Sequence, residues 1–229
     1  MQYSTFAAID IGSYDVILEI FEISKKQGIR SVDKICHRME LGKDTYTLGK
    51  IRPEMEEELC RVLADFVRIM EGYRVDAYRA MASSAISEAA NSLYVLGKIR
   101  QLTGLSVTVL SNSEQRFLGY KALAAMEDNF NKIIEKGTAI LDLDGGSFQI
   151  SLFDKDALVT TQNIRMGSLR VRERLAGIQS ETEHYEEMVE ELIWNEVSSF
   201  KKMYLKDRKI ENIMLIGDVF TDSVYQNIE

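Results

Sequence analysis

The sequence predicts an α/β fold with two lobes that repeat one order of elements, three strands followed by alternating helices and strands. Two observations carry this prediction. A short apolar strand ending in an Asp and a Gly turn opens the chain as FAAIDIGS from Phe6 to Ser13, and it returns as TAILDLDGGS from Thr138 to Ser147. The 229 residues also suit two lobes of about 100 to 130 residues each.

Residues 1–134 form the first predicted lobe, with the order βββαβαβα. Apolar runs predict a hairpin and a third strand, and Pro53 opens a helix whose apolar residues recur at helical spacing. The remaining elements alternate up to the end of the lobe. The predicted ranges are strands at 6–12, 16–23, 30–42, 75–82 and 105–110, and helices from 53, at 84–102 and at 113–134.

Residues 135–229 form the second predicted lobe, which opens as the first one does. We expect strands at 138–146, 147–154, 158–166 and 212–218, with two helices covering 168–204. The acidic segment 181–192 predicts a solvent-facing helix. Its inward residues are predicted to be Tyr185, Met188, Val189 and Leu192.

The two repeated turns predict a phosphate-binding clamp in a cleft between the lobes. A turn of small residues lets backbone N–H groups approach phosphate oxygens, and an Asp at the strand end can hold hydrated Mg²⁺ or orient a water. Asp10 and Asp142 occupy the equivalent positions. A single Asp-Gly turn more often just closes a hairpin, but two turns in matching positions favour the clamp.

Net charge, apolar runs and cysteine spacing indicate which classes of protein are disfavoured. The net charge of −8 disfavours general nucleic-acid binding, which needs surfaces rich in Lys and Arg. With no apolar run of about 18 residues to span a membrane and no leader sequence, we expect a soluble cytoplasmic protein that binds no membrane. Cys36 and Cys60 lack metal-binding or disulfide spacing, so we expect two buried free thiols.

Five motifs, in order, resemble the exopolyphosphatase and guanosine pentaphosphate phosphatase (Ppx/GppA) family. They are AAIDIGS, ASSAISEAAN at 82–91, LSNSEQ at 110–115, DLDGGSFQ at 142–149 and RMGSLRVRERL at 165–175. The resemblance implies an actin-like (ribonuclease H-like) fold, Mg²⁺ as cofactor, and polyphosphate or guanosine pentaphosphate as the ligand. It also implies a second lobe that is incomplete at its C-terminal end, and it leaves a homodimer open.

The resemblance assigns roles to particular residues. The phosphate-binding positions are Gly12, Ser13, Tyr14, Ser87, Gly145, Gly146 and Ser147, and the metal-binding positions are Asp10 and Asp142. The catalytic positions are Gln115, Glu114 and Asp142. Seven positions depart from the family pattern, namely Tyr14, Asp15, Ser87, Gln115, Asp144, Phe148 and Gln149. The family has an Arg at the position of Ser87, its general base Glu at Gln115 and a carboxylate at Gln149, so the resemblance implies weak or lost hydrolysis.

Three functional interpretations follow from these departures. A working phosphohydrolase would need Glu114 as the base, with Arg79 or Arg116 as the missing cation. A non-catalytic sensor or interaction module would need only the binding turns. An actin-like sugar or acetate kinase would need a Gly-rich adenosine-binding turn, for which IGDVFTD at 216–222 is a poor match.

Overall fold

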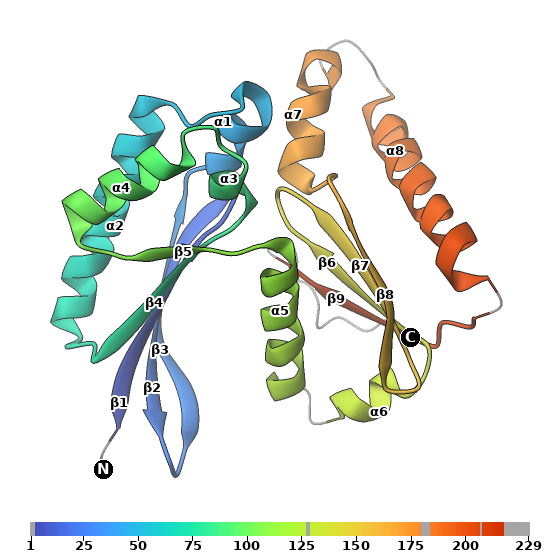
Figure 1. The fold of residues 1–229 in the computed structure, drawn as a ribbon, viewed down its shortest axis with the longest axis horizontal. Coiled ribbons are helices and arrows are strands. Elements are labelled where there is room, and N and C mark those ends of the chain that lie inside the picture. The colour runs from blue at the N-terminus through green and yellow to red at the C-terminus, as the bar shows by residue number, and fades with distance from the viewer. Residues whose placement is uncertain (1–2, 127–128, 180–183, 207, 218–229) are drawn as a thin grey trace. The chain divides into compact units, whose positions relative to one another are not determined.

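The computed structural model describes residues 3–126, 129–179, 184–206 and 208–217. The chain divides into two compact units, Met1–Gln115 and Arg116–Glu229. Each unit is built on its own β-sheet with helices against it (Figure 1). Among the described residues, no helix combines the length and the apolar character needed to cross a bilayer.

The first unit contains a five-stranded sheet in the order β3-β2-β1-β4-β5. β1 pairs with β2 and β2 with β3 in antiparallel fashion, whereas β1–β4 and β4–β5 are parallel. The strands are β1 (Ser4–Ile11), β2 (Asp15–Ser24), β3 (Gly28–Arg38), β4 (Ala77–Ala82) and β5 (Val107–Val109). The helices are α1 (Leu41–Leu48), α2 (Pro53–Gly72), α3 (Ser84–Ser87) and α4 (Ser92–Thr103).

The core of the first unit lies between this sheet and its helices. Alternate residues of β1, including Ile9 and Ile11, are fully buried, as the period of two along a strand requires. The helical spacing predicted after Pro53 is confirmed, because Leu59, Leu63 and Phe66 of α2 join the same cluster. Each such side chain contributes about 1.5 to 3 kcal/mol of burial free energy.

The first unit differs from the prediction in two places. The helix predicted at 84–102 is observed as two helices, because Asn91 leaves the helical path. The Asn91 Oδ1 accepts from the Ile51 N–H at 3.0 Å, and its Nδ2 donates to the Ile51 carbonyl at 2.8 Å. The third strand ends at Arg38 rather than at residue 42, and the residues after it form α1, which was not predicted. Both cysteines are free, but Cys36 is exposed, so the prediction of two buried thiols was wrong for that residue.

The second unit repeats the strand order of the first as β8-β7-β6-β9. Its strands are β6 (Thr138–Leu143), β7 (Phe148–Asp154), β8 (Ala157–Ile164) and β9 (Asn212–Ile216). Its helices are α5 (Asn112–Met126), which enters the unit at Arg116, α6 (Phe130–Ile134), α7 (Ser168–Gln179), α8 (Tyr185–Phe200) and the π-helical turn η1 (Lys201–Leu205). The helix predicted at 113–134 is therefore observed as α5 and α6.

Both faces of the second sheet carry apolar clusters. Tyr120 and Leu123 of α5 and Phe130 of α6 pack with Ile140 and Phe153 on one face. On the other face, Phe200 at the end of α8 packs with Ile150 and Leu152. The first of these faces also carries Asp142 and Gln149, which follow the same alternation along their strands as Ile140 and Phe153.

The internal duplication extends to the register of the strands. Asp10 pairs with Ile17 across the first hairpin, and Asp142 pairs with Gln149 across the hairpin of the second unit. The residue on the parallel neighbour is Met81 for Asp10 and Ile216 for Asp142. The predicted equivalence of Asp10 and Asp142 is confirmed at the level of individual residue pairs.

Candidate functional site: two matching turns

The first turn connects β1 to β2 and is held closed by its own backbone. The Gly12 N–H donates to the Asp15 carbonyl at 3.0 Å, and a Cβ on Gly12 would lie 3.0 Å from that same oxygen. The carbonyl of Tyr14 accepts from the N–H groups of Met39 and Glu40, at 3.0 and 2.9 Å. These bonds fix the turn against the start of α1.

Three hydroxyl groups meet beside this turn. The Tyr46 hydroxyl lies 2.6 Å from Ser13 Oγ and 2.8 Å from Ser84 Oγ, while the two serine oxygens are 3.5 Å apart. Ser13 is 4% exposed, so its orientation is set by these partners rather than by water. The sequence pattern indicated Ser13 but gave no sign of Tyr46 and Ser84, which are 33 and 71 residues away along the chain.

The side chain of Tyr14 faces a cation. Its ring lies under the guanidinium of Arg38, with the Arg38 Cζ 4.6 Å from the ring centroid. Tyr14 stands where the resembling family has a small polar residue, and Arg38, at the end of β3, has no counterpart among the positions singled out from sequence. Arg38 Nε also lies 3.8 Å from a Glu40 carboxylate oxygen, so the guanidinium is held beside the first turn with its charge partly balanced by Glu40.

The second turn connects β6 to β7 and closes in the same way. The Asp144 N–H donates to the Ser147 carbonyl at 3.0 Å, at positions that match Gly12 and Asp15 in the first turn. Gly145, Gly146 and Ser147 are all buried. The two hairpins therefore close with an equivalent backbone hydrogen bond, although Asp144 stands where the family has a glycine.

Helix α7 begins directly against the second turn. The N–H groups of Ser168 and Arg170 donate to the carbonyls of Asp144 and Gly145, at 3.1 and 3.0 Å, and Arg170 Nε donates to the Gly146 carbonyl at 2.9 Å. Part of the positive N-terminal end of α7 is thus bound to the turn itself rather than left for a ligand. The Arg170 guanidinium is held beside the glycines.

Three predicted site residues of the first unit, two phosphate-binding and one catalytic, lie at one edge of its sheet. α3 starts at Ser84, which contacts Ser13, and Ser87 lies one helical turn further on and is exposed. α5 starts three residues after β5, so half-buried Gln115 lies near the same carboxyl ends of parallel strands. Ser13, Ser87 and Gln115 are therefore brought to a common edge.

Glu114 forms a capping box with Ser111 at the start of α5. Its carboxylate accepts from the Ser111 N–H at 2.9 Å and from the Ser111 hydroxyl at 2.7 Å. The backbone bond, followed by the hydroxyl bond, holds the pKa of Glu114 below its ordinary value. A weaker base is poorly matched to proton removal from water near neutral pH.

Replacing this cap gives a pH-dependent prediction. Because the folded-state pKa of Glu114 is depressed, its stabilisation is present above the unfolded pKa and is lost as the pH falls through the folded pKa. We expect Glu114→Gln to lower the melting temperature at neutral pH and the difference from the wild type to shrink in acid. Thermal unfolding by circular dichroism over a pH series measures this, and a difference independent of pH would contradict it.

The donor set was tested for the Mg²⁺ ion that the family resemblance implies. Across the described residues, no group of three or more His, Cys, Asp and Glu side chains could hold a metal ion. Asp10 is exposed and Asp142 half-buried, and the strand partner of Asp142 is the neutral Gln149. Mg²⁺ usually keeps several waters and is held by one or two carboxylates together with the phosphates of a ligand, so these residues fit Mg²⁺ only as an ion shared with a bound phosphate.

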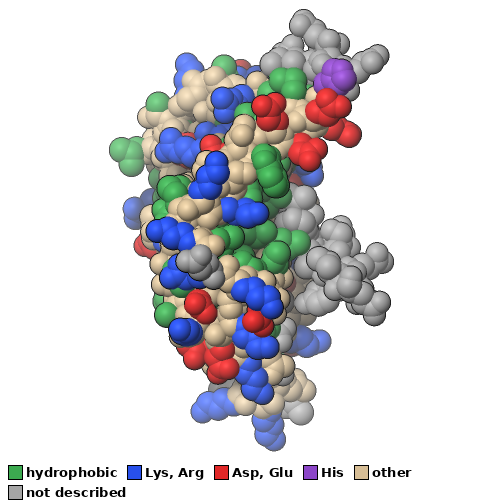
Figure 2. Space-filling view, turned by 90° about the vertical axis from the view of Figure 1, so that its right-hand side faces the viewer, with side chains coloured by type: hydrophobic (Ala, Val, Ile, Leu, Met, Phe, Trp, Pro, Cys, Tyr) green, Lys and Arg blue, Asp and Glu red, His purple; other side chains and the backbone are tan. Residues whose placement is uncertain are grey.

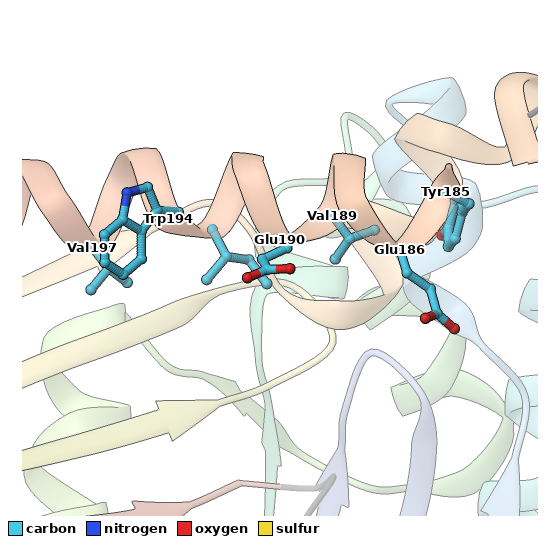
Figure 3. A pocket seen from close by; sticks show the side chains of 7 residues that line it. Tyr185, Glu186, Val189, Glu190, Trp194 and Val197 are labelled. Carbon is cyan, nitrogen blue, oxygen red and sulfur yellow. The ribbon is translucent and has the colours of Figure 1, made fainter. Parts of the chain in front are cut away.

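A separate cavity lies along α8 and has a different character. It is an open hollow of about 560 Å³ at the surface, and its lining side chains all come from that helix (Figure 3). They are Tyr185, Glu186, Val189, Glu190, Ile193, Trp194 and Val197. The side of the molecule that carries α8 shows acidic side chains grouped near apolar ones (Figure 2). Carboxylates beside apolar groups disfavour a polyanion, so we assign no phosphate site to this cavity.

The inward face predicted for this acidic helix is observed in part. Tyr185, Met188, Val189 and Leu192 are half-buried, and Phe200 is the fully buried residue of α8. Trp194, which was not among the predicted inward residues, is 61% exposed.

Comparison with known proteins agrees with this geometry. The model of the Ppx/GppA phosphatase family matches residues 19–229. The bifunctional 3-dehydroquinate synthase/phosphatase of Fusobacterium nucleatum is 21% identical over 174 residues, 73% of this chain and 26% of that protein. Exopolyphosphatase 1 of Mycobacterium leprae is 26% identical over 144 residues, 62% of this chain and 41% of that enzyme. The chain thus spans about a quarter and about two fifths of the length of these two relatives.

Solved structures share the fold. The Ppx/GppA family member of Aquifex aeolicus superposes with a TM-score of 0.70 at 22% identity, covering 96% of this chain and 68% of that one. The predicted actin-like α/β fold is confirmed. With the family match over most of its length, the chain belongs to the Ppx/GppA phosphatase family.

Proposed function

We propose that this chain binds the phosphate groups of inorganic polyphosphate or guanosine pentaphosphate through its two turns, and that it hydrolyses them weakly or not at all. The observation that carries the proposal is that both turns close with an equivalent backbone hydrogen bond, from Gly12 N–H to the Asp15 carbonyl and from Asp144 N–H to the Ser147 carbonyl, while the activating side chains differ from the family pattern. Binding without turnover is the property that a phosphate sensor requires.

The binding half of the proposal rests on hydroxyl, amide and cationic groups. Ser13 at the first turn belongs to a three-hydroxyl cluster, and Arg38 and Arg170 lie beside the first and second turns. Buried hydroxyls and guanidinium groups form charge-assisted hydrogen bonds with phosphate oxygens. At each turn, such groups offset the repulsion that a net charge of −8 exerts on a polyanion.

The second part of the proposal, weak or absent hydrolysis, rests on side chains that lack the charge or the basicity that hydrolysis needs. Ser87 carries no charge to stabilise a developing phosphate charge, and the Gln115 amide cannot accept a proton from water. Glu114 is bound to Ser111 as a helix cap. Loss of a positioned base typically lowers the rate by about 10²- to 10⁴-fold.

Calorimetric titration with inorganic tripolyphosphate tests binding, and phosphate release tests turnover. We expect Ser13→Ala and Ser147→Ala each to weaken binding about tenfold, because a hydrogen bond to a charged group contributes about 1.5 to 3 kcal/mol. Ser31→Ala is the matched control, since Ser31 bonds Glu19 on an exposed hairpin. Unchanged affinity in both turn variants would contradict the proposal.

The alternatives predict different results in the same assays. A working phosphohydrolase would release phosphate from tripolyphosphate or guanosine pentaphosphate in repeated turnovers. A sugar or acetate kinase would bind ATP and transfer its phosphoryl group. Of the segment 216–222 considered for that activity, residues 218–222 lie outside the described residues, and Gly217 packs against the backbone of Leu143.

A further inference from the structure

A row of three polar residues crosses the sheet of the second unit beside the second turn. Asp142 on β6 pairs with Gln149 on β7, and Gln149 pairs with Asn163 on β8. Directly paired residues point to the same face of a sheet, with Cβ atoms about 4.5 to 5.5 Å apart. The three side chains therefore form one polar strip, here called the amide row after its two amide residues, Gln149 and Asn163.

The amide row contains buried polar atoms that lack partners. Gln149 is 1% exposed, yet neither its Nε2 nor its Oε1 has a hydrogen-bond partner among the described residues. The Oδ1 of Asn163 is likewise buried and without a partner there. Leaving a buried polar group unsatisfied destabilises the folded state, so a buried amide with neither its nitrogen nor its oxygen bonded requires an explanation.

The next row along the same strands is satisfied. Ser151 pairs with Thr161, their hydroxyls are 3.2 Å apart, and the Tyr120 hydroxyl of α5 donates to Ser151 Oγ at 2.5 Å. On this face of the sheet, the described atoms without partners therefore lie two residues closer to the turn. Two other buried atoms without partners among the described residues, Gln162 Oε1 on the opposite face and Ser168 Oγ at the start of α7, lie outside this row. Half-buried Arg116 lies one turn before Tyr120 on α5, on the same side of that helix, and adds a positive charge.

We propose that the second turn holds a phosphate group through neutral amide donors, chiefly Gln149, and needs no bound divalent cation to do so. This inference rests on the proposed function. A second carboxylate at position 149, beside Asp142, would add to the repulsion of an anion unless a metal ion lay between them, whereas the amide Nε2 donates to a phosphate oxygen directly. The amide N–H donors thus bind the phosphate without a metal ion between the side chain and the ligand.

The remaining open atoms fit the same ligand. Gln149 Oε1 and Asn163 Oδ1 are acceptors, so they need a donor and not a bare oxyanion. The hydroxyl of a singly protonated phosphate, or a water molecule bound with it, supplies that donor. The amide side chains offer both donors and acceptors, and a protonated phosphate with its bound water offers both as well.

The experiment compares wild type and Gln149→Glu by calorimetric titration with tripolyphosphate, once in EDTA and once in millimolar Mg²⁺. Comparing the two proteins within one buffer removes the effect of Mg²⁺ on the ligand itself. We expect the wild type to bind in EDTA and Gln149→Glu to bind about tenfold or more weakly there. In Mg²⁺ the gap should close to about threefold or less, because a cation can then bridge carboxylate and phosphate.

Two further variants separate binding from folding. Gln149→Leu removes the donor without adding charge and is expected to weaken binding about tenfold in both buffers. Gln162→Leu is the matched control, because Gln162 is adjacent to Asn163 on β8 and points to the opposite face. Its affinity should equal that of the wild type, and circular dichroism checks that each variant is folded.

The outcomes distinguish this inference from the proposed function. Wild-type binding that requires Mg²⁺ and disappears in EDTA would overturn the inference and leave the proposed function standing. Equal affinity of wild type and Gln149→Leu would also overturn it. Absence of binding in both buffers would overturn the proposed function together with the inference.

Discussion

Replacing Gly167 by Ala is expected to abolish phosphate binding at the second turn and to lower the free energy of unfolding by about 1 to 3 kcal/mol. A Cβ at this position would overlap the Ser147 nitrogen, the Asp144 oxygen and the Gly145 carbonyl carbon. All three are backbone atoms, so no side-chain rotation relieves the overlap, and α7 must move away from the turn. The hydrogen bonds from Ser168 and Arg170 to the turn would be lost with that movement.

Urea unfolding measures the stability change, and tripolyphosphate titration measures the binding. Gly97→Ala is the control, because Gly97 lies inside α4 and a Cβ there meets no atom within 4 Å. That variant should gain about 0.5 to 1 kcal/mol, since Ala is the better helix former, and should keep the wild-type affinity. If Gly167→Ala bound tripolyphosphate as the wild type does, contact between α7 and the turn would not matter for the ligand.

Local patterns were sufficient to predict most of the fold. The spacing of Leu59, Leu63 and Phe66 indicated the buried face of α2, and the repeated strand-Asp-turn pattern indicated the two hairpins whose registers agree residue for residue. These features depend on neighbours in sequence, which a pattern records. α1 was missed because it is short and its residues Asp44 and Thr45 are buried by tertiary bonds, to Arg52 and to the Ala85 carbonyl.

The candidate site was less predictable, because its contacts join distant segments. Tyr46 and Ser84 reach Ser13 from α1 and α3, and no local spacing connects the three. The departure at Gln149 was visible in the sequence, but its missing partners depend on how α5 covers the sheet. The Ser-x-x-Glu spacing at 111–114 did carry a local signal for a helix cap, which competes with a catalytic interpretation of Glu114.

Restoring the family's Arg and its general base Glu, the two groups missing at positions 87 and 115, is expected to give the largest increase in the rate of hydrolysis. We expect the double variant Ser87→Arg and Gln115→Glu to release phosphate from tripolyphosphate at least about 10²-fold faster than the wild type. An Arg at 87 lies one helical turn from Ser84, beside the first turn, and its fork suits phosphate oxygens. A carboxylate at 115 can accept the proton of an attacking water. Initial rates of phosphate release measure the gain.

Each single variant should give a smaller gain than the double one, because the base and the cation act on the same transition state and their effects are not additive. Adding Glu114→Gln to the double variant is the decisive control. If Glu114 is held by Ser111 as a cap, the restored rate survives this third change, although the protein becomes less stable. If instead the third change removes the rate and Gln115→Glu alone adds nothing, then Glu114 is the base. The capping bonds would in that case have to open during catalysis.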